Sequence, residues 1–228
     1  MIPKIIHQVW EGRQNPLSDF YTQLSGTWKE HHPAWQYKFW DGDRMDAFVR
    51  EHFPDFAGTY FGYRYPVQRW DTIRYLILFK IGGMYVDFDY ECLESFDDLI
   101  TENGTCFFAM EPDEHRRALG KTLCFNNALM ATSPGHPFFK HIIEHLTSTP
   151  FSYSGNKVHD VLTSTGPLML SNLYENYKGT DVRILPADQV SPWSQREVRN
   201  FVAGIADEEL LEKKLEKAIA IHYFWGSW

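Results

Sequence analysis

The sequence contains little cysteine. Its three cysteines are Cys92, Cys106 and Cys124, and none of them forms a CxxC pair. A disulfide framework needs an even and denser set of cysteines, and a structural zinc site uses closely spaced ones, so the sequence favours neither. Three isolated thiols fit a reducing compartment. We therefore expect a cytoplasmic protein.

Clusters of basic residues are also missing. The formal net charge is −8. Proteins that bind nucleic acid along an extended surface carry a basic patch, so this class is not favoured. A small phosphate ligand bound through a metal ion stays compatible with the charge.

Long apolar runs and a targeting segment are lacking as well. No run approaches the roughly 20 apolar residues that span a bilayer. The start, MIPKIIHQVW, resembles the entry to a strand more than a signal peptide. We expect no transmembrane segment, and at most peripheral contact with the inner face of a membrane.

Aromatic residues, in contrast, are plentiful, with 17 Phe, 12 Tyr and 8 Trp. They fit a core of large rings. They also fit a groove lined with rings, which suits sugars and nucleobases because both offer flat faces for stacking. Composition leaves the two interpretations open.

Strand-like and helix-like segments alternate along the 228 residues. The sequence predicts a mixed α/β fold with a mostly parallel central sheet flanked by helices. The clearest helix spans 67–81, because its apolar residues recur at spacings of three and four. Strands are expected at 4–10, 35–40, 84–86, 105–110, 124–131 and 181–185, and helices at 17–32, 41–53, 136–147, 167–177 and 207–220.

Asp87 and Asp89 directly follow the glycine-containing strand GGMYV. Residues i and i+2 of an extended segment point the same way, so the two carboxylates form a ligand pair for a hard divalent cation. Ligands of α/β sheets bind beyond the carboxyl ends of strands, where this pair lies. The alternative is a solvated turn, in which Asp is common.

Asp71 and Arg74 stand three residues apart on one face of the 67–81 helix. They form either a surface ion pair of little energetic worth or a polar pair aimed into a cleft. Spacing alone does not separate the two interpretations.

Two further segments are candidates. Trp10 ends the first strand and serves either as core or as a platform for a base. The last residues, HYFWGSW, are either packed into a groove or form a lid over a ligand. In the lid, His222 would ligate the metal, Ser227 would contact a phosphate or the metal, and the indole N–H of Trp228 would donate to a phosphate oxygen.

Taken in order, these motifs resemble glycosyltransferase family 32. The resemblance rests on IPKIIHQVW (2–10), DTIRYLILFKIGGMYVDFDYE (71–91) and the terminal His, Ser and Trp. NNALMATSPGHP (126–137) and TSTGP (163–167) are also similar to the family. The family contains bacterial capsular and lipopolysaccharide transferases and fungal initiating α-1,6-mannosyltransferases. A more distant similarity links the chain to the catalytic domain of clostridial glucosylating toxins.

The resemblance implies a single GT-A domain over 1–228, with 222–228 as a tail that closes over the donor site. It implies a retaining hexosyltransferase that uses Mn²⁺ or Mg²⁺ and a nucleoside diphosphate sugar, with UDP favoured over GDP. The acceptor would be a hydroxyl of a saccharide, including a lipid-linked one, in polysaccharide or glycolipid synthesis. A nucleotide-sugar hydrolase and a catalytically silent binding module are the alternatives.

Site roles follow from the same resemblance. Trp10 would stack on the base, and Asp71 and Arg74 would hold sugar hydroxyls. Asp87 would contact the ribose and sugar, and Asp89 would be the direct metal ligand. The implied catalytic set is Asp71, Arg74, Asp87 and Asp89; the donor-binding set is Trp10, Asp71, Arg74, Asp87, Ser227 and Trp228; the metal set is Asp87, Asp89 and His222. Residues 111–123 are expected to form a polar loop, either solvated or near the acceptor.

Overall fold

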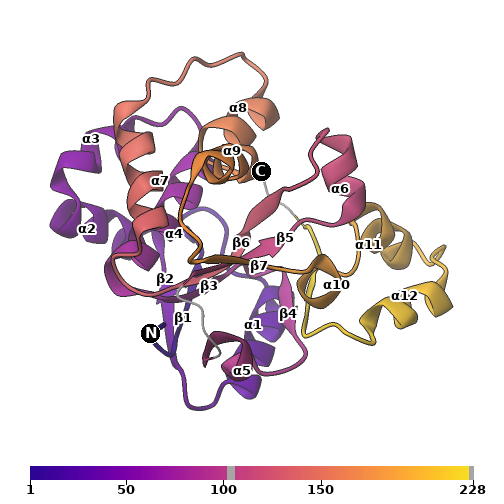
Figure 1. The fold of residues 1–228 in the computed structure, drawn as a ribbon. Helices are drawn as coiled ribbons and strands as arrows, with labels where there is room; N and C mark the ends of the chain where they lie inside the picture. The colour runs from indigo at the N-terminus through magenta and orange to yellow at the C-terminus, as the bar shows by residue number, and fades with distance from the viewer. Residues whose placement is uncertain (102–105, 226–228) are drawn as a thin grey trace.

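The computed structural model describes residues 1–101 and 106–225 and has a six-stranded sheet with helices on both faces (Figure 1). In spatial order the strands are β2 (Gln36–Trp40), β1 (Ile5–Val9), β3 (Gly83–Val86), β6 (Phe125–Thr132), β5 (Cys106–Met110) and β7 (Val182–Leu185). A second sheet pairs β4 (Tyr90–Cys92) with β8 (Ala220–His222). Across the described residues, no helix has both the length and the apolar character needed to cross a bilayer.

The helices form two layers and a lateral group. The first nine are α1 (Asp19–His31), α2 (Gly42–His52), α3 (Pro54–Gly62), α4 (Pro66–Ile81), α5 (Asp97–Thr101), α6 (Asp113–Ala118), α7 (Pro137–Ser148), α8 (Lys157–Ser164) and α9 (Pro167–Asn176). They are followed by α10 (Ala187–Val190), α11 (Gln195–Val202) and α12 (Glu208–Leu215). In Figure 1, α2, α3, α7, α8 and α9 lie above the sheet, α1 and α5 lie below it, and α6, α11 and α12 lie at its right end.

The sheet is mixed but mostly parallel, as predicted. β1 pairs in parallel with β2 and β3, and β5 pairs in parallel with β7. β6 runs antiparallel to both β3 and β5. Five strands therefore end at the same edge of the sheet, and β6 alone among these six runs the other way.

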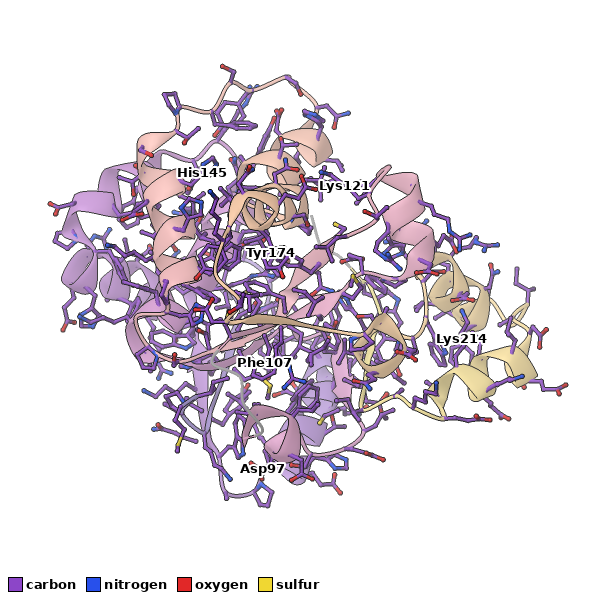
Figure 2. The ribbon with its side chains drawn as sticks, in the orientation of Figure 1. Asp97, Phe107, Lys121, His145, Tyr174 and Lys214 are labelled. Atoms are coloured by element: carbon purple, nitrogen blue, oxygen red, sulfur yellow. The ribbon has the colours of Figure 1, made fainter. Side chains whose placement is uncertain are left out.

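Alternation along the strands divides the core between the two faces of the sheet. Tyr85 of β3 packs into the upper core, whereas its neighbours Met84 and Val86 pack into the lower one. Figure 2 labels one ring from each side: Tyr174 packs against the upper core and Phe107 belongs to the lower one. All three cysteines are buried and free of disulfides.

Two glycines connect α4 directly to β3. Gly82 ends the helix with φ +72°, and Gly83 follows with φ +102°. Both values lie in the region that side chains disfavour. A Cβ on Gly83 would also come within 2.6 Å of the Ile5 carbonyl oxygen. The glycines therefore let β3 pair closely with β1, and this brings Asp87 to the carboxyl edge of the sheet.

Helix α4 is more buried than its apolar stripe indicates. The stripe predicts one core-facing side, but every residue from Asp71 to Leu78 is buried. The helix lies between the sheet and the helices α2, α3, α7 and α8, so even Asp71 and Arg74 are removed from bulk water. The pair is therefore not a solvated surface ion pair.

Two of the predicted elements are wrong. The helix expected over 207–220 ends at Leu215, because Ala220–His222 pairs as a strand with Tyr90–Cys92. The loop expected over 111–123 contains the short helix α6. Backbone pairing and contacts with α11 decide both segments, and these partners are distant in sequence.

Candidate active site

A cavity of about 320 Å³ opens at the carboxyl ends of β1 and β3. One side is formed by the segment after β1, which includes Trp10. Another side is formed by the first turns of α4, together with Arg74. Asp87 and Asp89 line the cavity between them, and Trp225 approaches from the end of the described chain. The cavity thus joins four of the segments that the sequence motifs single out.

Asp87 is held tightly by the protein. Its Oδ2 accepts a hydrogen bond from Arg74 Nη1 at 3.0 Å, and its Oδ1 accepts one from the Tyr85 hydroxyl. Its backbone N–H donates to the Ala128 carbonyl oxygen at 2.8 Å. Burial raises the pKa of Asp87, although the Arg74 guanidinium opposes this shift. The carboxylate is therefore fixed in position before any ligand binds.

Asp71 belongs to a buried network of hydrogen bonds next to Arg74. Asn127 Nδ2 donates to one of its oxygens at 2.8 Å, and Thr165 Oγ1 donates to the other at 2.9 Å. Arg74 Nη2 is 3.6 Å from Asp71 Oδ1. Burial raises the pKa of Asp71 to about 6, against the pull of Arg74 and its hydrogen-bond donors. In this arrangement Arg74 lines the cavity, and Asp71 orients Arg74.

Asp89 pairs with His222 across the small sheet. Antiparallel pairing of β4 and β8 sets Tyr90 opposite His222, and the two rings stack with centroids 4.2 Å apart. His222 Nε2 is 3.3 Å from Asp89 Oδ1. Burial opposes both charged forms, but their mutual attraction lowers the pKa of Asp89 and raises that of His222. The structure thus brings together two residues that lie 133 positions apart in the sequence.

The oxygen and nitrogen atoms of Asp87, Asp89 and His222 fit a hard divalent cation that is coordinated partly by these side chains and partly by a ligand. Asp87 and Asp89 offer carboxylate oxygens at the cavity. His222 Nδ1 is buried and has no hydrogen-bond partner among the described residues. Within 1–101 and 106–225, no three Asp, Glu, His or Cys side chains form a metal-binding group by themselves. Mg²⁺-type ions commonly bind through one or two carboxylates plus substrate phosphates, and the two carboxylates of such a set are present here.

Trp10 is positioned as a flat wall of the cavity. Its Nε1 donates to the Asn15 carbonyl oxygen at 2.7 Å, which fixes the ring plane. Phe88 contacts it edge-on, with centroids 6.0 Å apart, and Tyr21 packs at 5.4 Å. The ring is only partly buried and lines the cavity, so one face is available to a ligand.

The predicted tail is described as far as Trp225. Trp225 lines the cavity and packs on Phe20 at 4.4 Å. The Tyr21 hydroxyl donates to the Trp225 carbonyl oxygen at 3.3 Å. Ser227 and Trp228 lie outside the described residues, and their predicted roles stay predictions.

Sequence reasoning missed several residues that shape the site. Asn127 and Thr165 fix Asp71, and Tyr85 fixes Asp87. Asn127 and Thr165 lie in the stretches 126–137 and 163–167, which are similar to the family but to which the sequence assigned no role. Tyr85 precedes Asp87 by two positions, so it points to the same side of the strand. That alternation was the one local signal available for Tyr85.

Comparison with known proteins supports the predicted resemblance. Residues 19–105 match the family described as "Glycosyltransferase sugar-binding region containing DXD motif". The chain is 30% identical to inositol phosphoceramide mannosyltransferase 1 of Schizosaccharomyces pombe, over 82% of this chain and 56% of that protein. It is 24% identical to the initiation-specific alpha-1,6-mannosyltransferase of the same organism, over 100% of this chain and 64% of that protein. The chain spans about half the length of the first curated relatives it matches.

Solved structures show the same fold. The PaToxG glycosyltransferase superposes with a TM-score of 0.54 at 17% identity, covering 95% of this chain and 77% of that one. Together with the sequence matches, this confirms the predicted GT-A fold. The sequence matches also support the predicted similarity to glycosyltransferases with a DXD motif.

Proposed function

Since the chain carries the DXD-containing sugar-binding region of a glycosyltransferase family and has a GT-A fold, we propose that it transfers a hexose from a nucleoside diphosphate sugar to an acceptor hydroxyl. The observation that carries the proposal is the arrangement of the cavity. Two carboxylates, a fixed guanidinium and a partly exposed indole ring line a single space of about 320 Å³. These groups match the cation, the hydroxyls and the flat base of such a donor.

Each residue has a separate task in this proposal. Trp10 stacks on the base, and its hydrogen bond to Asn15 keeps the ring in plane. Arg74 holds donor-sugar hydroxyls, while Asp71 sets the orientation of its guanidinium. Asp87 contacts the ribose and the sugar. Asp89 and His222 would hold the divalent cation, and Asp87 would act on it through water.

A bound Mn²⁺ or Mg²⁺ would supply positive charge that stabilises a diphosphate leaving group. The carboxylates lie within the reach of Arg74 and His222, so the protein tolerates their charge before the cation arrives. Asp87 and Arg74 then keep the sugar aligned as its bond to the diphosphate breaks. Fixing the reacting groups in this way is the main contribution that such a site makes to the rate.

We further propose that the reaction retains the anomeric configuration by displacement on one face of the sugar. Asp87 is engaged by both Arg74 and Tyr85, which leaves it poorly placed to act as a nucleophile. The departing diphosphate would help to deprotonate the acceptor hydroxyl. Trapping a covalent glycosyl adduct on any carboxylate of the protein would contradict this step.

The names of the curated relatives favour mannose as the transferred sugar and a glycolipid or glycan as the acceptor. Among the donors that the sequence leaves open, the one that carries mannose is GDP-mannose. The names of the relatives therefore weigh against the predicted preference for UDP, and the test includes both UDP and GDP donors. A lipid-linked acceptor, peripheral contact with a membrane and a cytoplasmic location stay predictions.

The test is a thermal-shift screen of UDP, GDP, UDP-sugars and GDP-mannose, each with and without Mn²⁺. A ligand at 100 times its dissociation constant adds about 2.7 kcal/mol to the stability of the folded state, which such a screen detects. We expect a Mn²⁺-dependent shift with one base, and no such shift for Asp89→Asn. A shift without Mn²⁺ would favour a silent binding module, and a donor cleaved without any glycosylated product would favour a hydrolase. No shift with any nucleotide would overturn the proposal.

A further inference from the structure

The backbone just beyond β8 has an unusual conformation. Phe224 has φ +52°, and it is the one non-glycine residue with positive φ in the described part of the chain. A bulky side chain disfavours this region, so surrounding contacts must hold it there. Two residues close to this turn belong to the candidate site: His222 meets Asp89, which lines the cavity, and Trp225 lines the cavity itself.

Contacts from two distant helices enclose Phe224. Its ring packs on His222 at 3.9 Å on one side. On the other side the His115 ring of α6 meets it edge-on at 4.6 Å. Gln195, the first residue of α11, donates its Nε2 to the Phe224 carbonyl oxygen at 3.2 Å. Both the ring and the carbonyl group of the turn are therefore fixed from outside β8.

His115 is itself locked in orientation. The backbone N–H of Gln195 donates to His115 Nε2 at 3.0 Å, so Nε2 carries no proton. His115 Nδ1 therefore carries the proton and donates to Glu111 Oε2 at 2.7 Å. Glu111 is 7% exposed. The neutral imidazole thus links the end of β5 to the start of α11 in one defined tautomer.

A second connection between the same helices lies away from the turn. Glu114 of α6 pairs with Arg196 of α11 through two hydrogen bonds of 2.9 and 3.0 Å, and it accepts another from the Ser194 hydroxyl. Arg196 is largely exposed. This connection joins α6 to α11, which lie side by side in Figure 1, at residues other than those that contact Phe224. It provides a control for effects of helix packing alone.

We propose that His115 and Gln195 are positioning residues for the sugar transfer. Through Phe224 they hold His222 against Asp89 and direct Trp225 to the cavity. Neither residue lines the cavity, so they act on the site through the turn. The inference rests on the proposed function for its effect on donor binding, but the positioning itself concerns only contacts within this chain.

The experiment compares His115→Ala and Gln195→Met with Arg196→Gln. The first readout is the imidazole NMR signal of His222 in the full chain without nucleotide, assigned from its loss in His222→Gln. We expect that signal to move and broaden in His115→Ala and Gln195→Met and to stay in place in Arg196→Gln. Gln195→Met keeps the backbone N–H that His115 accepts, so it removes one side-chain hydrogen bond and serves if His115→Ala folds poorly.

The second readout is Mn²⁺ affinity, measured by electron paramagnetic resonance in the presence of the nucleotide diphosphate that the thermal screen selects. Partners that orient a metal ligand typically contribute about 10–100-fold in affinity, so both positioning variants should weaken Mn²⁺ binding by that range. Arg196→Gln should bind Mn²⁺ like the unmodified protein. Melting temperatures establish that each variant is folded.

Three outcomes would decide the matter. An unchanged His222 signal with unchanged Mn²⁺ affinity in both positioning variants would overturn the proposal. Equal changes in all three variants would assign the effect to packing of α6 on α11 and would also overturn it. If the unmodified protein binds no nucleotide with Mn²⁺, the proposed function fails, and the His222 signal alone still decides whether His115 and Gln195 position the turn.

Discussion

On one side of the cavity, Arg74 and Asp87 line the space, and Asp71 shares Arg74 with Asp87. Asn127, Thr165 and Tyr85 donate to the oxygens of these two carboxylates. We call these residues the helix–strand wall, since they lie mainly on α4 and β3. On the other wall, Asp89 faces His222, and Phe224 and Trp225 follow on an irregular segment. We call these four residues the tail wall. In the helix–strand wall, both carboxylates have hydrogen-bond donors within the protein. In the tail wall, the buried Nδ1 of His222 has no hydrogen-bond partner among the described residues.

This difference indicates a division of labour. The helix–strand wall is ordered by the core that surrounds it, so in the proposed reaction it would fix the donor sugar at little further entropic cost on binding. The tail wall rests on two three-residue strands and on contacts from α6 and α11. In the proposed function, its polar groups would gain their remaining partners from a cation and a diphosphate. Stability should therefore depend on the first wall, and ligand-dependent behaviour on the second.

The largest expected effect on stability is that of Arg74→Met. The substitution leaves the buried carboxylate of Asp71 and the partly buried one of Asp87 without their cation, and breaking a buried pair costs about 3–5 kcal/mol. We expect the free energy of unfolding, measured by urea denaturation, to fall by that amount. Arg69→Met is the control, because Arg69 lines the cavity from the same helix and its guanidinium lies 5.8 Å from the Tyr60 ring. Equal losses in the two variants would contradict the special status of the helix–strand wall.

The tail wall is tested by Asp89→Asn. The amide keeps an oxygen toward His222 but loses the charge that a divalent cation needs. We expect kcat/KM to fall by about 100–1,000-fold, the range for removing one electrostatic contact to a developing charge. The melting temperature without ligand should change little. Normal turnover in this variant would remove the cation from the proposal, and a collapse of stability would place Asp89 with the helix–strand wall.

The sequence predicted the helix–strand wall better than the tail wall, for physical reasons. Alternation, helical spacing and the Gly82–Gly83 pair are local signals, and they placed Asp71, Arg74, Asp87 and Asp89 correctly on α4 and after β3. The strand β8 was not predicted, and its first residue Ala220 was assigned to the helix over 207–220. Its strand partner lies about 130 residues earlier, and no proline or glycine separates it from α12.

Burial was harder to foresee than secondary structure. Spacing could not tell whether Asp71 and Arg74 face water, because that depends on Asn127 and Thr165, which are 56 and 94 residues from Asp71. The same limit applies to His115 and Gln195. His115 lies in the loop predicted over 111–123, and Gln195 lies beyond the last predicted central strand. Only the fold brings the two residues to Phe224.

Dependence of stability on pH distinguishes Asp71 from the rest of the core. Its pKa is raised from 3.8 to about 6 in the folded protein, chiefly by burial. The folded state therefore holds the proton more tightly than the unfolded state, and the resulting stability is lost as pH rises from about 4 to about 6. Asp71→Asn lacks this loss. The variant should gain on the order of 3 kcal/mol relative to the unmodified protein across that window.

The measurement is the difference between the two free energies of unfolding at each pH. A plot of the free energy of unfolding of the unmodified protein against pH would hide the effect. Burial lowers the pKa of His7 to about 4, so the protein loses stability through His7 as pH falls below 6.5. Altered hydrogen bonds to Asn127 and Thr165 add a constant that does not change the slope. A flat difference between pH 4 and pH 6 would mean that the carboxyl of Asp71 titrates normally.

The smallest effect concerns Trp10, whose ring is held by its neighbours and would contact the proposed ligand through a flat face. Base–aromatic stacking is worth about 1–3 kcal/mol, so Trp10→Ala should weaken nucleotide binding by that amount in calorimetry. Trp10→Phe keeps a ring but loses the hydrogen bond to Asn15 that fixes its plane. If prior fixing of the ring matters, Phe should restore only part of the affinity, with a less favourable entropy of binding. Full recovery with Phe would show that ring area alone suffices, and equal loss in both variants would assign the contribution to the indole N–H and the loop it holds.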